Sequence, residues 1–132
     1  MNALKTILAS CTLAVACLSA TACQPSYQAI EFNTISSPPV NVTIRDFLIE
    51  MPAGVGAAVR VSPISANNNE YDSGQRIDLR SQDRDVLTVY RRKSRREFVL
   101  VGVNPGTTCL EVVIDGRGEE CIDVEISEPA GG

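Results

Sequence analysis

The sequence Cys109–Ile126, CLEVVIDGRGEECIDVEI, decides the fold. Apolar and polar residues alternate in both halves of this stretch, and a turn signal, Asp115-Gly116-Arg117-Gly118, separates the halves. This pattern predicts two antiparallel strands with one buried face. The apolar rows that we expect to face the core together are Leu110, Val112 and Ile114 on the first strand, and Ile122, Val124 and Ile126 on the second.

Two cysteines of this hairpin, Cys109 and Cys121, fall on its outward side, where they can form a disulfide. Bridging requires Cα atoms roughly 5.5 Å apart, which we expect when the two residues are directly opposed. That register makes Val113 to Arg117 the connecting loop, whereas a tighter turn would offset the cysteines by two positions and disfavour a bridge. We predict the Cys109–Cys121 disulfide, because cysteines this close in sequence tend to oxidise in an oxidising compartment, where the N-terminal segment described below is expected to direct the chain.

Five further segments have the alternation or the short apolar runs of β-strands, and turn signals rich in Gly, Pro, Asn and Asp separate them. Beyond residue 22 no segment has a convincing helical period. Seven short strands at this spacing predict an all-β chain folded as a β-sandwich. The five segments are Val40–Ile44, Val55–Val61, Ile77–Arg80, Val86–Tyr90 and Phe98–Val101.

Two motifs near the C-terminus narrow this prediction. Ser81–Val89 reads SQDRDVLTV, and Gly102–Val112 reads GVNPGTTCLEV. Together they resemble a bacterial immunoglobulin-like domain of group 2, a family that pairs a Ser-x-Asp-x-x-Val-x-x-Val strand with a Gly-Val-x-x-Gly-Thr-x-x-Leu/Ile-x-Val turn and strand. The resemblance implies an immunoglobulin-like β-sandwich over residues 40–126 that serves binding, adhesion or spacing rather than catalysis. The chain departs from the family in lacking a Trp near Ile77 and in carrying a cysteine pair on its last hairpin.

The N-terminus has the three parts of an export signal. Lys5 supplies a positive charge, an apolar run follows over residues 6–20, and small residues close it at Ala20-Thr21-Ala22. We expect residues 1–22 to be a cleaved lipoprotein signal peptide and Cys23 to be the lipid-attachment site, with Cys17 a weaker candidate. The alternative is ordinary signal cleavage, which would give a plain secreted β-sandwich protein with a spare cysteine.

The lipoprotein interpretation also predicts a location. Acyl chains on Cys23 would hold the protein on a membrane, and this membrane anchor is the first expected partner. In the lipoprotein family an Asp after the lipidated cysteine often marks retention at the inner membrane. Gln24 occupies that position here, so we expect a cell-envelope protein at the outer membrane.

The remaining boundaries follow from composition. Residues 23–39 contain Pro25, Pro38 and Pro39 and are expected to form an extended tether, with an edge strand over 29–35 as the alternative. The domain is expected over residues 40–126 and a flexible tail over 127–132.

Catalytic chemistry has little support in this sequence. The chain has no His, and a Cys109–Cys121 disulfide would leave no thiolate for catalysis or metal binding. The carboxylate pairs Asp83/Asp85 and Glu119/Glu120 lack the surrounding ligand spacing of a metal loop. We interpret both pairs as solvated surface charge and expect no catalytic residue, no metal and no cofactor.

A basic run stands out from an acidic background. The chain carries 12 Lys and Arg residues against 16 Asp and Glu residues, yet five cations fall within six positions between two predicted strands. Such a cluster is typical either of a surface that captures anions or of a solvated loop that keeps strand edges from pairing. Nucleic acid is not expected, because stacking aromatic residues are missing nearby. The candidate anion-binding residues are Arg91, Arg92, Lys93, Arg95 and Arg96.

These observations favour a non-enzymatic envelope lipoprotein whose immunoglobulin-like domain binds an anionic surface or an envelope protein. A second hypothesis is a structural component of a secretion or pilus assembly that joins a partner strand through a sheet edge. A small hydrolase using carboxylates is a third. The oligomeric state does not follow from the sequence.

Overall fold

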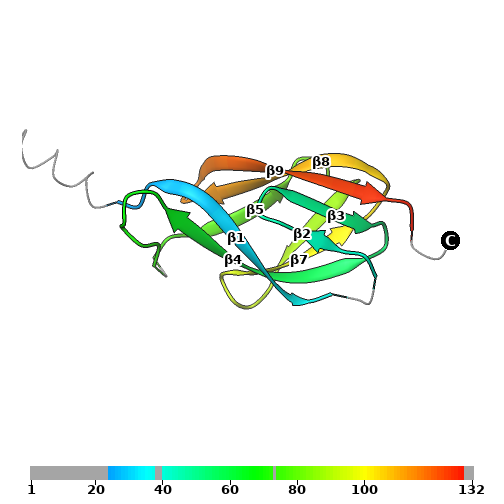
Figure 1. Cartoon of the computed structure of the whole chain (residues 1–132), viewed down its shortest axis with the longest axis horizontal. Coiled ribbons are helices and arrows are strands. Elements are labelled where there is room, and N and C mark those ends of the chain that lie inside the picture. The colour runs from blue at the N-terminus through cyan, green and yellow to red at the C-terminus, as the bar shows by residue number, and fades with distance from the viewer. Residues whose placement is uncertain (1–23, 38–39, 73, 130–132) are drawn as a thin grey trace, which may run out of the picture.

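A computed structural model describes residues 24–37, 40–72 and 74–129, and every regular element in these ranges is a β-strand (Figure 1). The all-β prediction is therefore confirmed, with nine strands in place of about seven. In chain order the strands are β1 (Tyr27–Ser36), β2 (Thr43–Ile44), β3 (Leu48–Pro52), β4 (Gly56–Ser65), β5 (Ile77–Ser81), β6 (Leu87–Arg91), β7 (Glu97–Gly102), β8 (Gly106–Ile114) and β9 (Arg117–Ser127).

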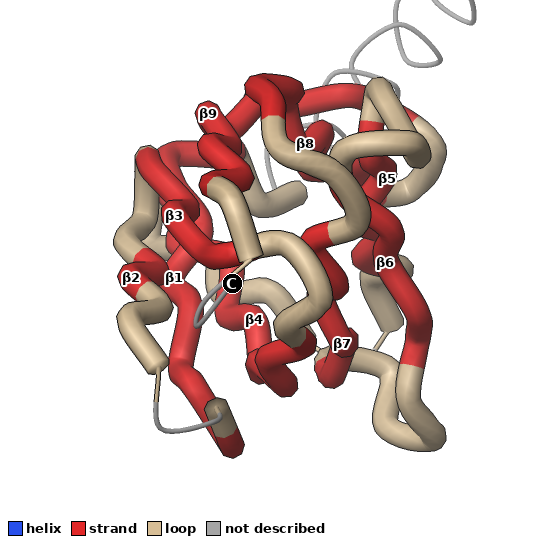
Figure 2. Tube along the Cα trace, turned by 90° about the vertical axis from the view of Figure 1, so that its right-hand side faces the viewer, coloured by secondary structure: helices blue, strands red, loops and turns tan. Residues whose placement is uncertain are grey.

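The strands form two sheets that pack face to face (Figure 2). One sheet has the order β1-β4-β7-β6 and the other the order β2-β3-β9-β8-β5. If β1, β4, β5, β6, β7, β8 and β9 are lettered A, B, C, D, E, F and G, the first sheet is A-B-E-D and the second contains G-F-C. This is the strand distribution of an immunoglobulin domain. Strand β3 adds to the second sheet by pairing in parallel with β9, with Ile49 opposite Val124.

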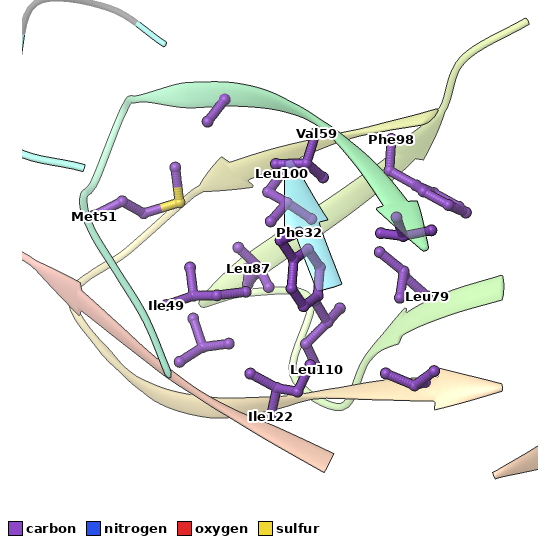
Figure 3. Close-up of a cluster of buried hydrophobic side chains, with 14 of the residues drawn as sticks. Phe32, Ile49, Met51, Val59, Leu79, Leu87, Phe98, Leu100, Leu110 and Ile122 are labelled. Atoms are coloured by element: carbon purple, nitrogen blue, oxygen red, sulfur yellow. The ribbon is translucent and has the colours of Figure 1, made fainter. Parts of the chain in front are cut away.

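The core lies between the two sheets and is entirely apolar. Alternate residues of each strand point into it, as Phe98 and Leu100 do from β7 and Leu110 and Val112 do from β8. Phe32 of β1 lies among side chains of both sheets (Figure 3). Among the described residues no polar or charged residue is buried, so polar groups are confined to the outward faces, the edges and the loops.

The expected tether is wrong for residues 27–36. These residues form β1, an edge strand that pairs with β4 and places Ile30 and Phe32 in the core. The alternative of an edge strand over 29–35 was close to the observed bounds. The sandwich therefore begins before residue 40. The physical reason is the period of two at Ile30 and Phe32, whose burial outweighs the prolines on either side of the strand.

The hairpin β8–β9 differs in register from the expected one. Asp115 and Gly116 form a tight two-residue turn, with φ values of 49° and 81° and with Ile114 opposite Arg117. Such a pair of positive φ angles suits the twist of the flanking strands and is typical of an Asp-Gly hairpin. The predicted longer loop, Val113 to Arg117, is therefore wrong.

The disulfide forms nevertheless. Cys109 lies opposite Asp123, and Cys121 lies opposite Glu111, so the cysteines are offset by two positions. Their Cα atoms are 5.5 Å apart, and the Cys109–Cys121 bridge is present. A twisted antiparallel pair shortens one of its two diagonals, and this brings offset residues within the range that a disulfide spans. The prediction of the bridge is confirmed, while the requirement for direct opposition is not.

Candidate anion-binding site

The basic run forms the hairpin between β6 and β7, at the sheet edge that β6 provides (Figure 2). Its backbone is closed by two hydrogen bonds: Arg92 N–H donates to the Glu97 carbonyl at 2.9 Å, and Glu97 N–H donates to the Ser94 carbonyl at 3.3 Å. We call residues 91–96 the basic hairpin. The tight closure holds its cations together at one end of the strands.

Arg91 is the structural member of the basic hairpin. Its guanidinium donates to the Ile77 carbonyl at 2.6 Å and to the Arg95 carbonyl at 3.0 Å, and it forms an ion pair with Asp78. The same group lies 5.0 Å from the centroid of the Phe98 ring, within cation–π range. Because Ile77 and Asp78 belong to β5, Arg91 joins the edge of one sheet to the edge of the other.

Carboxylates and carbonyls hold other cations of this region in place. Glu97 is shared, with Arg60 Nη2 at 2.6 Å from one carboxylate oxygen and Arg92 Nη1 at 3.5 Å from the other. Arg96 donates to the Asp72 carbonyl at 2.6 Å. Lys93 is fully outside such contacts in the described part of the chain and lies exposed near the hairpin tip. Arg92 and Lys93 are therefore the hairpin cations that can bind an anionic ligand with the least disruption of the fold.

A cavity of about 340 Å³ lies beside the hairpin and is lined by Arg76, Ile77, Arg91 and Arg95. Arg76 Nε is 3.0 Å from Asp78 Oδ2, so Asp78 receives both Arg76 and Arg91. Arg76, Arg91 and Arg95 thus bring three guanidinium groups to this cavity, and two of them are paired with Asp78. Such an arrangement attracts carboxylate, phosphate or sulfate groups by charge and by the donor geometry of arginine.

Sequence reasoning found the basic hairpin but missed Arg60 and Arg76, which the fold brings to it. Arg60 reaches Glu97 because β4 pairs with β7, and Arg76 reaches Asp78 two residues along β5. Neither residue lies in a charged run, so composition gives no signal for them. The available signal was the position of Arg60 on the polar phase of a predicted strand.

The two carboxylate pairs have local roles. Asp83 Oδ1 accepts a hydrogen bond from Asp85 N–H at 3.0 Å, and the Asp83 carbonyl accepts from Leu87 N–H at 3.0 Å, so Asp83 shapes the turn before β6. Glu119 and Glu120 lie on β9, beside a register shift of the β8–β9 pair. In residues 24–37, 40–72 and 74–129, no three His, Cys, Asp or Glu side chains gather as metal ligands.

Glu119 and Glu120 lie near two tyrosines. Burial, followed by the charge of Glu120, raises the pKa of Tyr27 well above its ordinary value of 10.0. Burial and the charge of Glu119 raise the pKa of Tyr71 in the same direction. Because Tyr27 opens β1 and packs against the core, its ionisation would bring a charge to the edge of the sandwich next to two carboxylates.

The raised pKa of Tyr27 predicts alkaline destabilisation. The folded chain holds the phenol proton to higher pH than the unfolded chain, so this contribution to stability is complete below pH 10.0 and is lost as the pH rises above it. We expect Tyr27→Phe to flatten the fall in the urea midpoint between about pH 9 and pH 11. Tyr90→Phe, at an exposed tyrosine, is the control. Parallel pH profiles for wild type and Tyr27→Phe would contradict the assignment.

Further predictions concern segments beyond the described residues. The predicted signal segment 1–22 and the predicted lipidation site Cys23 lie outside them, and so does the end of the predicted tail. No helix capable of crossing a bilayer is found in the part of the chain that the structure describes.

No protein-family model matches the chain, and no curated protein matches it. Solved structures that resemble it are domains 4 and 5 of the S-layer protein SbsC (15% identity, TM-score 0.49, covering 71% of this chain and 53% of that one) and domains 5–6 of the same protein (16%, 0.49, 76% and 47%). The chain thus spans about half the length of either structure. The immunoglobulin-like fold of this chain follows from its own strand order and pairing.

Proposed function

We propose that this protein is a non-enzymatic, lipid-anchored component of the cell envelope whose immunoglobulin-like domain binds an anionic envelope constituent through the basic hairpin. The observation that carries the proposal is the concentration of cations at one sheet edge, where Arg76, Arg91 and Arg95 line one cavity and Arg92 and Lys93 extend beside it.

Acidic residues on the outward side of the five-stranded sheet support this proposal. Along β3, β8 and β9 the outward side of the five-stranded sheet carries Glu50, Glu111, Asp123 and Glu125, which alternate with buried apolar residues. At the edge strand β5 of this sheet, Arg80 lies opposite Glu111. An anionic surface would repel this face and attract the basic hairpin. Charge separation of this kind orients a protein on a surface and speeds its capture.

The hairpin cations are predicted to determine binding to anionic surfaces. We expect Arg92→Gln/Lys93→Gln to weaken binding to vesicles of anionic lipid by roughly 30-fold, because a cation near such a surface contributes about 1 kcal/mol. Cosedimentation at low salt measures the effect, and added salt should release the wild type. The variant leaves Arg91 and its contacts in place.

The matched control is Arg45→Gln/Arg117→Gln, which removes the same charge from exposed positions outside the hairpin. This control should bind nearly as the wild type does. Equal loss in both variants would mean that net charge alone governs retention, and unchanged retention of the hairpin variant would leave the basic hairpin as a solvated loop.

The lipid anchor is tested separately by the intact mass of the mature protein. We expect a chain that begins at Cys23 and carries acyl groups, with a further gain of about two hydrogen masses on reduction of the single disulfide. A mature chain without acyl mass would support the plain secreted protein instead.

One observation favours the second hypothesis, assembly through a sheet edge. Strand β1 is a ten-residue edge strand with Glu31 as its one charged residue, and it lacks the lysines and prolines that commonly protect an edge. Under this hypothesis β1 would pair with a strand of a partner protein. Co-purification of the protein in a large assembly, together with loss of that assembly in Asn33→Pro, would support this hypothesis. A protein that stays monomeric at all concentrations would count against it.

A further inference from the structure

The positive charge of this chain extends well beyond the basic hairpin. Residues 76–96 carry eight of the 12 cations of the chain and only three of its 16 carboxylates. They comprise β5, the following turn, β6 and the hairpin. Strands β5 and β6 are the edges of the two different sheets, and they contact each other along one side of the sandwich (Figure 2).

Two cavities lie along this side. The first, about 340 Å³, is lined by Arg76, Arg91 and Arg95 together with Ile77. The second, about 310 Å³, is lined by Arg80 and Arg84 together with Leu79, Ser81 and Val89. We call these five arginines the arginine strip. Arg76 and Arg80 are four residues apart on an extended chain, which separates their Cα atoms by about 13 Å.

The carboxylates on this side are engaged locally, and Asp115 is one of them, since its Oδ1 accepts the Arg76 N–H at 2.9 Å. Asp78 is engaged by Arg76 and Arg91. Asp83 accepts the Asp85 N–H within the turn. Glu111 of β8 lies opposite Arg80 in the sheet register, so it faces one end of the strip only. Arg76 is 75% exposed at its side chain, and Arg80, Arg84 and Arg95 are also exposed.

The shape of the strip distinguishes between kinds of anion. Its cavities lie in the seam between two sheet edges, where a narrow chain fits better than a flat bilayer. The hairpin tip offers no apolar side chain for insertion into lipid, because Phe98 is buried. Tyr90 points to the outward face of the four-stranded sheet, opposite Val99, so the strip also lacks the stacking aromatics of a single-stranded nucleic-acid site.

We propose that the arginine strip binds a linear acidic polysaccharide laid along β5 and β6, with non-adjacent carboxylate groups of one polymer chain at the two cavities. This inference rests on the proposed function, since the basic hairpin forms one end of the strip. It adds Arg80 and Arg84 to the binding surface and names the class of ligand.

The test uses polygalacturonate, a linear chain with one carboxylate on each sugar, and the full-length protein. We expect Arg80→Gln/Arg84→Gln to weaken binding to polygalacturonate by about five- to tenfold, as two exposed ionic contacts would. Binding to anionic vesicles should change by less than twofold, because these two arginines lie away from the hairpin tip. The control Arg45→Gln/Arg117→Gln removes equal charge elsewhere, and the thermal midpoints of all variants establish that they are folded.

The outcomes separate this inference from the proposed function. If Arg92→Gln/Lys93→Gln weakens binding while Arg80→Gln/Arg84→Gln behaves as the control does, the strip is not a polysaccharide site and the hairpin function stands. If Arg80→Gln/Arg84→Gln reduces vesicle binding as much as polymer binding, the surface is a membrane-binding face and the inference is wrong. If no variant changes either measurement, both proposals fail.

Discussion

Replacing Phe98 by alanine should lower the free energy of unfolding by about 3–5 kcal/mol, the cost expected for removing a buried aromatic ring. Phe98 is 2% exposed and is among the largest buried side chains of the sandwich. Its ring also underlies the Arg91 guanidinium, a contact worth about 0.5–1 kcal/mol at a partly exposed site. Since a small domain is stable by only about 5–15 kcal/mol, we expect a large drop in the urea midpoint.

Phe98→Leu separates the two effects. It fills most of the core volume and should cost less than about 1.5 kcal/mol, but it removes the ring beneath Arg91. Limited trypsin digestion reports on the hairpin, since Arg92 and Lys93 are cleavage sites within it. Faster cleavage in Phe98→Leu at nearly native stability would show that the ring positions the basic hairpin. A Phe98→Ala variant as stable as the wild type would contradict the observed core.

Loss of the Cys109–Cys121 disulfide should have the second largest effect. A closed loop of this size, with a sequence separation of 12, contributes about 3 kcal/mol on the chain-entropy description. We expect Cys109→Ser/Cys121→Ser to shift the urea unfolding midpoint accordingly. Serine fits both positions, because Cys121 is exposed and Cys109 is half-buried.

Reduction of the wild type provides the matched measurement. Reductant should bring the wild type to the midpoint of the double-serine variant and should leave that variant unchanged. Coincident unfolding curves of the oxidised and reduced wild type would contradict the contribution of the bridge. Because β8 and β9 lie at the centre of the five-stranded sheet, reduction should also expose a larger share of the domain than the hairpin alone.

Alternation in the sequence was sufficient to locate β4 through β9 within a few residues. The failures have separate causes. The segment Leu48–Pro52 was missed because Pro52 is a residue type that favours turns, whereas β3 is stabilised by parallel pairing with β9, a distant strand. The strand predicted over Val40–Ile44 is longer than β2, whose two residues pair with β3 alone. Local pattern does not report such long-range pairing.

The candidate site was only partly accessible to sequence reasoning. The run Arg91–Arg96 was visible as composition, and its place between two strands followed from alternation. The sequence did not indicate which of these cations are structural, because the contact of Arg91 with Asp78 depends on how the edges of two sheets meet. The same packing places Arg80 and Arg84 at one cavity, and no spacing rule links these positions to the hairpin.

The ends of the sandwich have a mechanical consequence. β1 begins at one end of the molecule and β9 finishes at the other (Figure 1). A pull between a fixed N-terminal attachment and a load on the C-terminus therefore runs along the strands. In the parallel pair β3–β9 this force slides one strand past the other, so neighbouring backbone hydrogen bonds share the tension and must rupture together. The domain should therefore resist a force along its strands better than a force that pulls one strand sideways from the sheet edge.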